Sequence, residues 1–169
     1  MTEEVKRNYL EINSLQDLIE GNKPSEDYSL SLINPINFQL NKFFYKNIGK
    51  KHKWVDRLTW SEEKWINYVS SKNVNSYVLK HKDDLVGFFE LIFHLENSET
   101  EIAYFGILEE YQNKKLGSFL LSEAIKKSFV KNTKRVWVHT CSLDHKNALN
   151  NYISSCLLYT SPSPRDKSS

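Results

Sequence analysis

The sequence contains few cysteines, little net charge and no long apolar segment. Its two cysteines, Cys141 and Cys156, cannot form a disulfide framework and suit a reducing compartment. The 23 Lys and Arg residues against 21 Asp and Glu residues leave a formal net charge of +2, which does not by itself indicate a polyanionic partner. The longest apolar runs, such as residues 85–89, are far shorter than the roughly 20 residues that a membrane helix needs. We therefore expect neither nucleic acid nor a membrane as a partner.

The composition is that of one folded domain. The 169 residues suit a single domain, and their 40% hydrophobic and 13% aromatic content can bury a core, which excludes a disordered or low-complexity chain for most of the length. The charged residues 1–7 precede no apolar segment with a cleavage site, so no secretory signal is expected. The sequence therefore predicts a cytoplasmic protein.

Helix and strand signals alternate along the chain. Pro35 predicts the start of a helix that Gly49 ends, and Thr59 with Glu62 forms a capping-box pattern that predicts the start of a second helix. Hairpins followed by strand, helix, strand and helix predict an α/β fold, with a mixed central sheet covered by helices on both faces. The alternating segments predict strands at 8–12, 27–33, 77–80, 85–95, 100–108 and 135–141, and further helices at 114–130 and 146–154.

The C-terminal segment differs from the rest in composition. Residues 161–169 are nearly all Ser, Pro and charged residues, and proline cannot donate to a sheet ladder. Residues 156–166 also resemble the translated sequence of a sequencing-library adapter. We therefore expect a domain over residues 1–155, truncated at its C-terminus, and a non-native or disordered tail over 156–169.

A strand–loop–helix segment carries the clearest functional signal. The loop contains Gln112, Asn113, Lys114 and Lys115, and a helix is expected directly after it. The first backbone N–H groups of a helix lack internal partners and lie at the positive end of its dipole, so such a loop can bind phosphate. Gly117 would let a ligand approach the backbone, and the two lysines would add charge for a pyrophosphate.

This segment resembles the GNAT superfamily of acyl-CoA-dependent N-acetyltransferases. Gln112 to Gly117 stand where that superfamily has Gln/Arg-x-x-Gly-x-Gly/Ala, with Lys115 in place of the first glycine. That lysine would cost about 1 kcal/mol if the position is left-handed and nothing if it is helical. The resemblance extends along most of residues 8–154, through phrases at 54–57, 101–106, 136–141 and 143–152.

The resemblance implies a GNAT fold, mostly antiparallel, and direct transfer of an acetyl group from acetyl-CoA to a primary amine of a small molecule or peptide. The amine must be neutral to attack a thioester, so a general base is useful. Glu101, 11 residues before Gln112, matches the catalytic glutamate of histone-acetylating members, and Glu90 is a second candidate. Tyr152 matches the tyrosine that protonates the departing thiolate. The C-terminal strands of the fold are expected to be missing.

The resemblance also implies which residues bind acetyl-CoA. The backbone of one strand would pair with the pantetheine arm, and the loop and first helical turn would hold the pyrophosphate. These residues are Phe105, Gly106, Ile107, Gln112, Asn113, Lys114, Lys115, Leu116, Gly117 and Ser118.

Two other functions compete with this interpretation. A non-catalytic acyl-CoA-binding or interaction module would keep the ligand site without turnover. A zinc site would need two separated ligand pairs, and the sequence offers one cluster without a second, so no metal is expected. That cluster is His139, Cys141, Asp144 and His145.

Overall fold

The computed structural model describes residues 7–52, 54–112, 114–141 and 158–160. Seven strands, three α-helices and three short 3-10 helices occur in these residues. Along the chain they are β1 (Arg7–Ile12), η1 (Leu15–Asp17), β2 (Tyr28–Leu32), α1 (Phe38–His52), α2 (Glu62–Ser70), β3 (Val74–His81), β4 (Asp84–His94), η2 (Leu95–Asn97), β5 (Glu99–Ile107), η3 (Glu109–Tyr111), α3 (Leu116–Ser128), β6 (Arg135–Cys141) and β7 (Leu158–Thr160).

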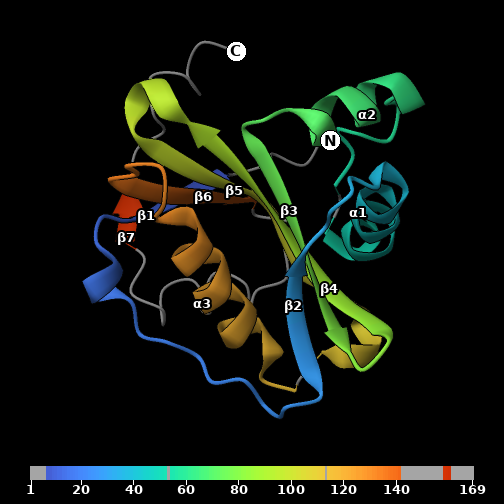
Figure 1. The fold of residues 1–169 in the computed structure, drawn as a ribbon, viewed down its shortest axis with the longest axis horizontal. Helices are drawn as coiled ribbons and strands as arrows, with labels where there is room; N and C mark the ends of the chain where they lie inside the picture. The colour runs from blue at the N-terminus through green and yellow to red at the C-terminus, as the bar shows by residue number, and fades with distance from the viewer. Residues whose placement is uncertain (1–6, 53, 113, 142–157, 161–169) are drawn as a thin grey trace, which may run out of the picture.

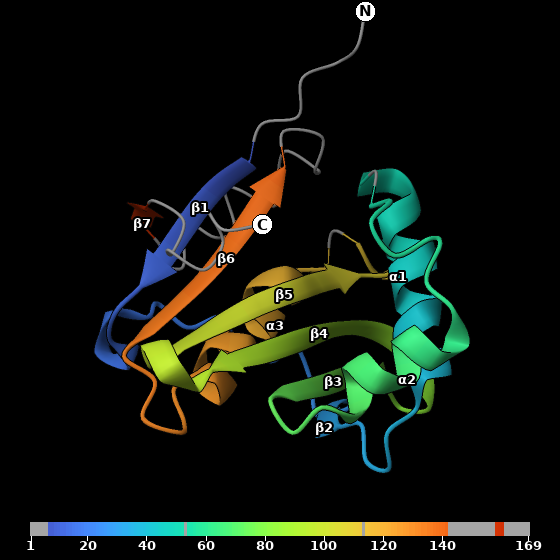
Figure 2. The ribbon, with the colours of Figure 1, turned by 90° about the horizontal axis from the view of Figure 1, so that it is seen from above.

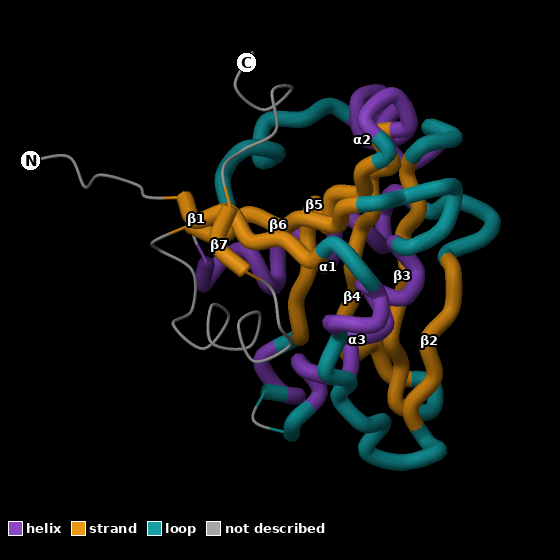
Figure 3. The backbone as a smooth tube through the Cα atoms, turned by 90° about the vertical axis from the view of Figure 1, so that its left-hand side faces the viewer, coloured by secondary structure: helices purple, strands orange, loops and turns teal. Residues whose placement is uncertain are grey.

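All seven strands join one sheet in the order β2-β3-β4-β5-β6-β1-β7. The pair β5–β6 is parallel, and the other neighbouring pairs are antiparallel. The helix α3 connects the two parallel strands, as a crossover between parallel neighbours requires. The sheet is strongly twisted, so that β1 and β6 run across the direction of β2 and β3 (Figure 3). The prediction of a mixed, mostly antiparallel sheet is confirmed.

Helices cover both faces of the sheet, as predicted (Figure 1). The face towards α3 carries the larger core, in which the apolar side of α3 packs on β4, β5 and β6. On the other face, α1 packs on β3 and β4 through a smaller cluster. This second cluster contains Phe44, Ile48, Val78, Phe88 and Leu108.

The expected end of the first helix and the expected cap of the second both differ from the structure. Gly49 lies inside α1 and does not end it. A Cβ at this position would come within 2.7 Å of the Trp54 side chain. The glycine therefore lets Trp54 pack on the helix. The second helix is capped by Ser61, whose side chain accepts a hydrogen bond from the Lys64 N–H at 3.2 Å, and not by Thr59.

The C-terminal segment contributes to the sheet. Leu158–Thr160 form β7, which pairs with Tyr9 to Glu11 of β1. These three residues form an edge strand, because the outer edge of β1 offers backbone partners to any extended segment, and the expected domain boundary at residue 155 stays a prediction. The helix expected at 146–154 lies outside the described residues. No described helix has the length and apolar character needed to span a bilayer.

Candidate functional site

The strands β5 and β6 separate halfway along the sheet. Their ladder runs from Glu99 opposite Arg135 to Ile102 opposite Val138 and ends there, although β5 continues to Ile107. Figure 2 shows the two strands diverging beyond this point. Beyond Ile102, the side of β5 that turns away from β4 has no partner strand among the described residues. An extended ligand can therefore pair with the backbone of β5 there.

A β-bulge lies at the same point. Tyr104 is opposite Glu90 and Ile102 is opposite Leu91, so Ala103 is an extra residue on β5. The bulge reverses the alternation of side chains along the strand. As a result Tyr104 packs on the α1 side and Phe105 on the α3 side.

The N-terminus of α3 lies just beyond the end of β5. The loop between them contains Leu108, η3 and residues 112–115, so the amides of the first helical turn, which lack partners within the helix, follow the strand closely. Lys115 precedes the helix with φ 60° and ψ 23°, the left-handed conformation. This position is the one at which the resembling motif has glycine. Lys114 and Lys115 are both exposed, so their charges are available to an anion.

The other predicted loop residues have distinct surroundings. The Gln112 side chain donates a hydrogen bond to the Ile107 carbonyl at 2.9 Å and so fixes the loop to the end of β5. Leu116 is buried in the core, which leaves its backbone amide as the group for a ligand. Gly117 and Ser118 follow it in the first turn and are partly exposed. Asn113 and Tyr152, also predicted site residues, lie outside the described residues.

Gly106 is also a packing position. A Cβ at this residue would lie 2.6 Å from Cγ2 of Ile48, so the absence of a side chain lets α1 approach β5. Neighbouring Phe105 packs against the core on the α3 face. The helix α1 is therefore held directly against the segment predicted to bind pantetheine.

Glu101, the first candidate for a general base, is paired with a histidine. Its Oε1 lies 3.0 Å from Nε2 of His94, and the two side chains are 15% and 14% exposed. His94 ends β4, and Glu101 follows it in the adjacent strand of the hairpin. No sequence motif marks His94, although the register of a hairpin with a turn over 95–98 places it close to Glu101. A largely buried carboxylate beside an imidazole can accept a proton and pass it on.

Glu90, the second candidate, is not accessible. It is 0% exposed, and its carboxylate accepts hydrogen bonds from three side chains. The donors are Asn41 Nδ2 at 2.8 Å, Arg57 Nη1 at 2.9 Å and Tyr68 OH at 2.7 Å. A carboxylate so enclosed cannot reach a substrate proton, so the alternative role for Glu90 as a base is wrong.

The guanidinium of Arg57 lies within a group of aromatic rings. It is 4.2 Å from the ring centroids of both Tyr68 and Tyr104. Burial opposes its charge, but Glu90 and the nearby phenols outweigh this effect and raise the pKa of Arg57. Burial and the same carboxylate raise the pKa of Tyr68, which therefore stays a neutral donor. The ion pair with Glu90 fixes the α1–α2 loop to β4, and the contact of Arg57 with Tyr104 fixes it to β5. The remaining rings near Arg57 are Tyr45, Trp60 and Trp65.

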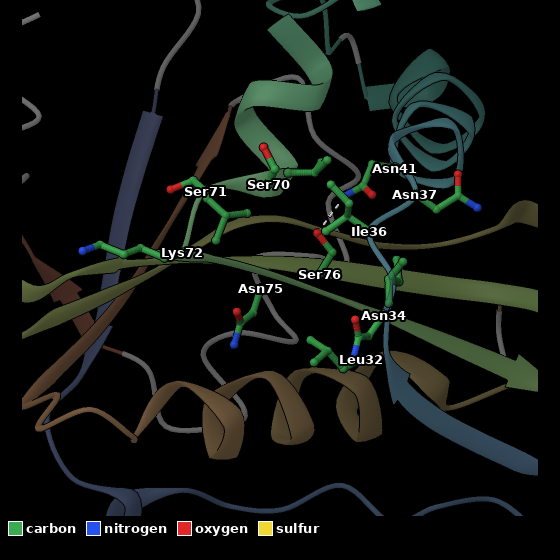
Figure 4. A pocket seen from close by; sticks show the side chains of 13 residues that line it. Leu32, Asn34, Ile36, Asn37, Asn41, Ser70, Ser71, Lys72, Asn75 and Ser76 are labelled. Atoms are coloured by element: carbon green, nitrogen blue, oxygen red, sulfur yellow. Dashed lines mark hydrogen bonds between the residues drawn. The ribbon is translucent and has the colours of Figure 1, made fainter. Parts of the chain in front are cut away.

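A small cavity of about 160 Å³ lies between α1, α2 and the start of β3 (Figure 4). Its floor includes Asn41 and Ser76, which are hydrogen-bonded to each other at 2.8 Å. Asn41 also bonds Glu90, so the cavity ends at the buried ion pair. None of the predicted catalytic or acetyl-CoA-binding residues lines it. Its walls combine aliphatic side chains with the amides and hydroxyls of Asn34, Asn37, Asn75, Ser70 and Ser71.

Residues 38–154 match the sequence profile of the Acetyltransferase (GNAT) family. The chain belongs to this family. The part of β5 beyond its ladder with β6 and the N-terminus of α3 lie inside the matched range. Among curated proteins no sequence match is found. In the described part of this GNAT domain, no group of three His, Cys, Asp or Glu side chains could hold a metal ion.

Several solved structures share the fold. A GCN5-related N-acetyltransferase from Sphaerobacter thermophilus has a TM-score of 0.70 at 12% identity. The match covers 91% of the present chain and 48% of the Sphaerobacter chain. The aminoglycoside acetyltransferase meta-AAC0020, from an uncultured soil metagenomic sample, has a TM-score of 0.66 at 12% identity, covering 79% of this chain and 90% of its own. The ribosomal-protein-S18-alanine N-acetyltransferase from Escherichia coli has a TM-score of 0.58 at 15% identity, covering 75% of each chain. These GNAT structures support the fold, and the present chain spans about half of the Sphaerobacter protein.

Proposed function

We propose that this protein transfers an acetyl group from acetyl-CoA to a primary amine. The observation that carries the proposal is the end of the β5–β6 ladder at Ile102, beyond which β5 runs on and leads directly to the first helical turn of α3. One ligand that has an extended amide-containing arm next to a diphosphate fits both features. Membership of the acetyltransferase family supports the same ligand.

The chain offers separate contacts to the two parts of acetyl-CoA. The backbone of Phe105 and Gly106 would pair with the pantetheine arm, while the side chain of Gln112 already occupies the Ile107 carbonyl. The first-turn amides of α3 would hold the pyrophosphate, and Lys114 and Lys115 would balance its charge. A backbone N–H of β5 near the thioester would stabilise the oxyanion that forms during attack.

Two residues would handle protons. Glu101 would take one proton from the acceptor ammonium, directly or through water, and His94 would share it. The neutral amine attacks the thioester carbonyl, the C–S bond breaks, and the thiolate takes a proton from Tyr152. The tyrosine regains its proton from the new amide nitrogen, so the step is balanced.

The acceptor belongs to a small molecule or a peptide in this proposal. An aminoglycoside acetyltransferase and a ribosomal-protein alanine acetyltransferase, two proteins of the same fold, represent these two kinds of amine. We also propose a cytoplasmic location, since two cysteines suit a reducing compartment.

Thiol release from acetyl-CoA in the presence of a panel of amines tests the function. We expect amine-dependent release and a loss of about 100-fold or more in kcat for Glu101→Gln, with unchanged calorimetric binding of acetyl-CoA. Glu63→Gln, which changes an exposed glutamate of α2 in the same way, serves as the matched control. Binding without amine-dependent turnover would instead identify a non-catalytic module, and an absence of binding would reject both functions.

A further inference from the structure

The β5–β6–β1 part of the sheet presents a polar and aromatic face that α1 and α2 do not reach (Figure 2). On β6, Val136 and Val138 point into the α3 core, so the residues alternating with them lie on this opposite face. The register adds residues of β1 and β5 that stand beside them. The members of this face, called here the acceptor face, are Tyr9, Glu11, His94, Glu99, Glu101, Arg135, Trp137 and His139.

The acceptor face is negatively charged. Three carboxylates, Glu11, Glu99 and Glu101, stand against the single guanidinium of Arg135. Arg135 binds Glu11 at 3.1 Å and Glu99 Oε2 at 3.1 Å. A positively charged ligand would be attracted here, and the attraction is strong because these side chains are more than four-fifths buried.

Two polar atoms of the face have no hydrogen-bond partner in the part of the chain that the structure describes. One is Oε1 of Glu99, an acceptor, and the other is Nε1 of Trp137, a donor on a side chain that is only 2% exposed. A buried donor left unpaired is unfavourable, so a ligand that pairs with it gains affinity. A ligand with one hydrogen-bond donor and one acceptor could pair with both atoms, its donor with Glu99 Oε1 and its acceptor with Trp137 Nε1.

We propose that the acceptor face binds a primary ammonium group that carries a hydroxyl or carbonyl oxygen two carbons away. This inference rests on the proposed acetyl transfer and defines the acceptor more narrowly. The ammonium donates to Oε1 of Glu99, and the oxygen accepts from Nε1 of Trp137. Glu101 stands directly opposite Trp137 in the β5–β6 ladder, two residues along β5 from Glu99, and would take the ammonium proton.

The spacing of the two groups suits such a ligand. Glu99 and Trp137 are diagonal neighbours across the β5–β6 ladder, at about 7 Å between backbones. A nitrogen and an oxygen separated by two carbons, with a hydrogen bond of about 2.9 Å at each end, can bridge side chains at this separation. The rings of Tyr9, His94 and His139 surround the indole at centroid distances of 6.2, 6.1 and 6.5 Å. Each of these three side chains is partly exposed.

Ethanolamine and propylamine are the probes, because they match in size and charge at pH 7 and differ in the oxygen. In the unmodified protein, titration of each amine is followed through the indole N–H signals of the four tryptophans. We expect ethanolamine to move the Trp137 signal saturably and to bind about fivefold to tenfold more tightly than propylamine. Equal affinities, or a Trp137 signal that stays in place, would overturn the proposal.

Three variants assign the contacts by ligand-observed NMR. Trp137→Phe keeps the ring and removes the donor, so the preference for ethanolamine should fall to about one. Glu99→Gln should weaken both amines by the same factor. Trp65→Phe is the matched control. Trp65 is 1% exposed and also has an Nε1 without a hydrogen-bond partner among the described residues, but it lies among the rings around Arg57. The preference for ethanolamine should persist in this variant. An equal loss of preference in the Trp65 variant would contradict the assignment.

The amine titrations involve no acetyl transfer. A preference that depends on Trp137 in a protein without turnover would support the acceptor face and reject the proposed function. Turnover of both amines with equal kcat/KM would reject the acceptor face and keep the proposed function.

Discussion

The left-handed lysine before α3 gives a quantitative prediction. A non-glycine residue in this conformation costs about 1–2 kcal/mol, whereas glycine adopts it without strain. Glycine also increases the entropy of the unfolded chain, which costs about 0.4–1 kcal/mol. With φ 60° at Lys115, the difference predicts that Lys115→Gly stabilises the domain by about 0.5–1 kcal/mol. Urea unfolding monitored by tryptophan fluorescence measures this change.

The neighbouring Lys114→Gly is the matched control. It removes the same charge from the same loop, but Lys114 is not among the residues with positive φ, so only the entropic cost applies. We expect this variant to lose about 0.5–1 kcal/mol, which gives the two variants shifts of opposite sign. Equal shifts in the two variants would refute the strain at Lys115, since they would follow from the lost charge alone.

Three further predictions concern the buried contacts and the base. Arg57→Ala leaves the Glu90 carboxylate buried without its cation and should lower the free energy of unfolding by about 3–5 kcal/mol in urea titrations; a loss under 1 kcal/mol would contradict the buried ion pair. Gly106→Ala should destabilise the domain, because its Cβ would lie 2.6 Å from Cγ2 of Ile48, and a double-mutant cycle with Ile48→Ala should recover about 1 kcal/mol. An absence of coupling would mean that another contact is responsible. Glu101→Gln should lower kcat by about 100-fold or more, and an unchanged kcat would assign the base elsewhere.

Most of the fold could be predicted from local patterns. The strand predicted at 135–141 matches β6 at both ends, and the predicted helix at 114–130 contains α3. Apolar residues that recur every two or every 3.6 positions indicate which side of a strand or helix is buried. These periods were enough to predict the sheet and the helices that pack on it. Gly49 was misassigned because a glycine that makes room for a distant tryptophan has the same local pattern as one that ends a helix.

The candidate site was only partly predictable. The sequence pattern located the loop before α3 but could not decide whether Lys115 is left-handed, because that depends on how the loop joins strand and helix. The bulge at Ala103 was also hidden, since strict alternation would put Glu101 and Phe105 on one face, whereas Phe105 packs in the core beneath α3. Glu90 was a plausible base by residue type. Its exclusion required the positions of Arg57 and Tyr68, which come from a different part of the chain.

The position of β1 between β6 and β7 has a consequence for folding during synthesis. In the described residues β1 pairs only with these two strands, and the ion pair that joins Glu11 to Arg135 spans 124 residues. The N-terminal strand leaves the ribosome first but gains its neighbours only after nearly all of the domain has emerged. Until then its backbone donors and acceptors are open to other chains, so we expect the nascent domain to depend on chaperones at its N-terminal end.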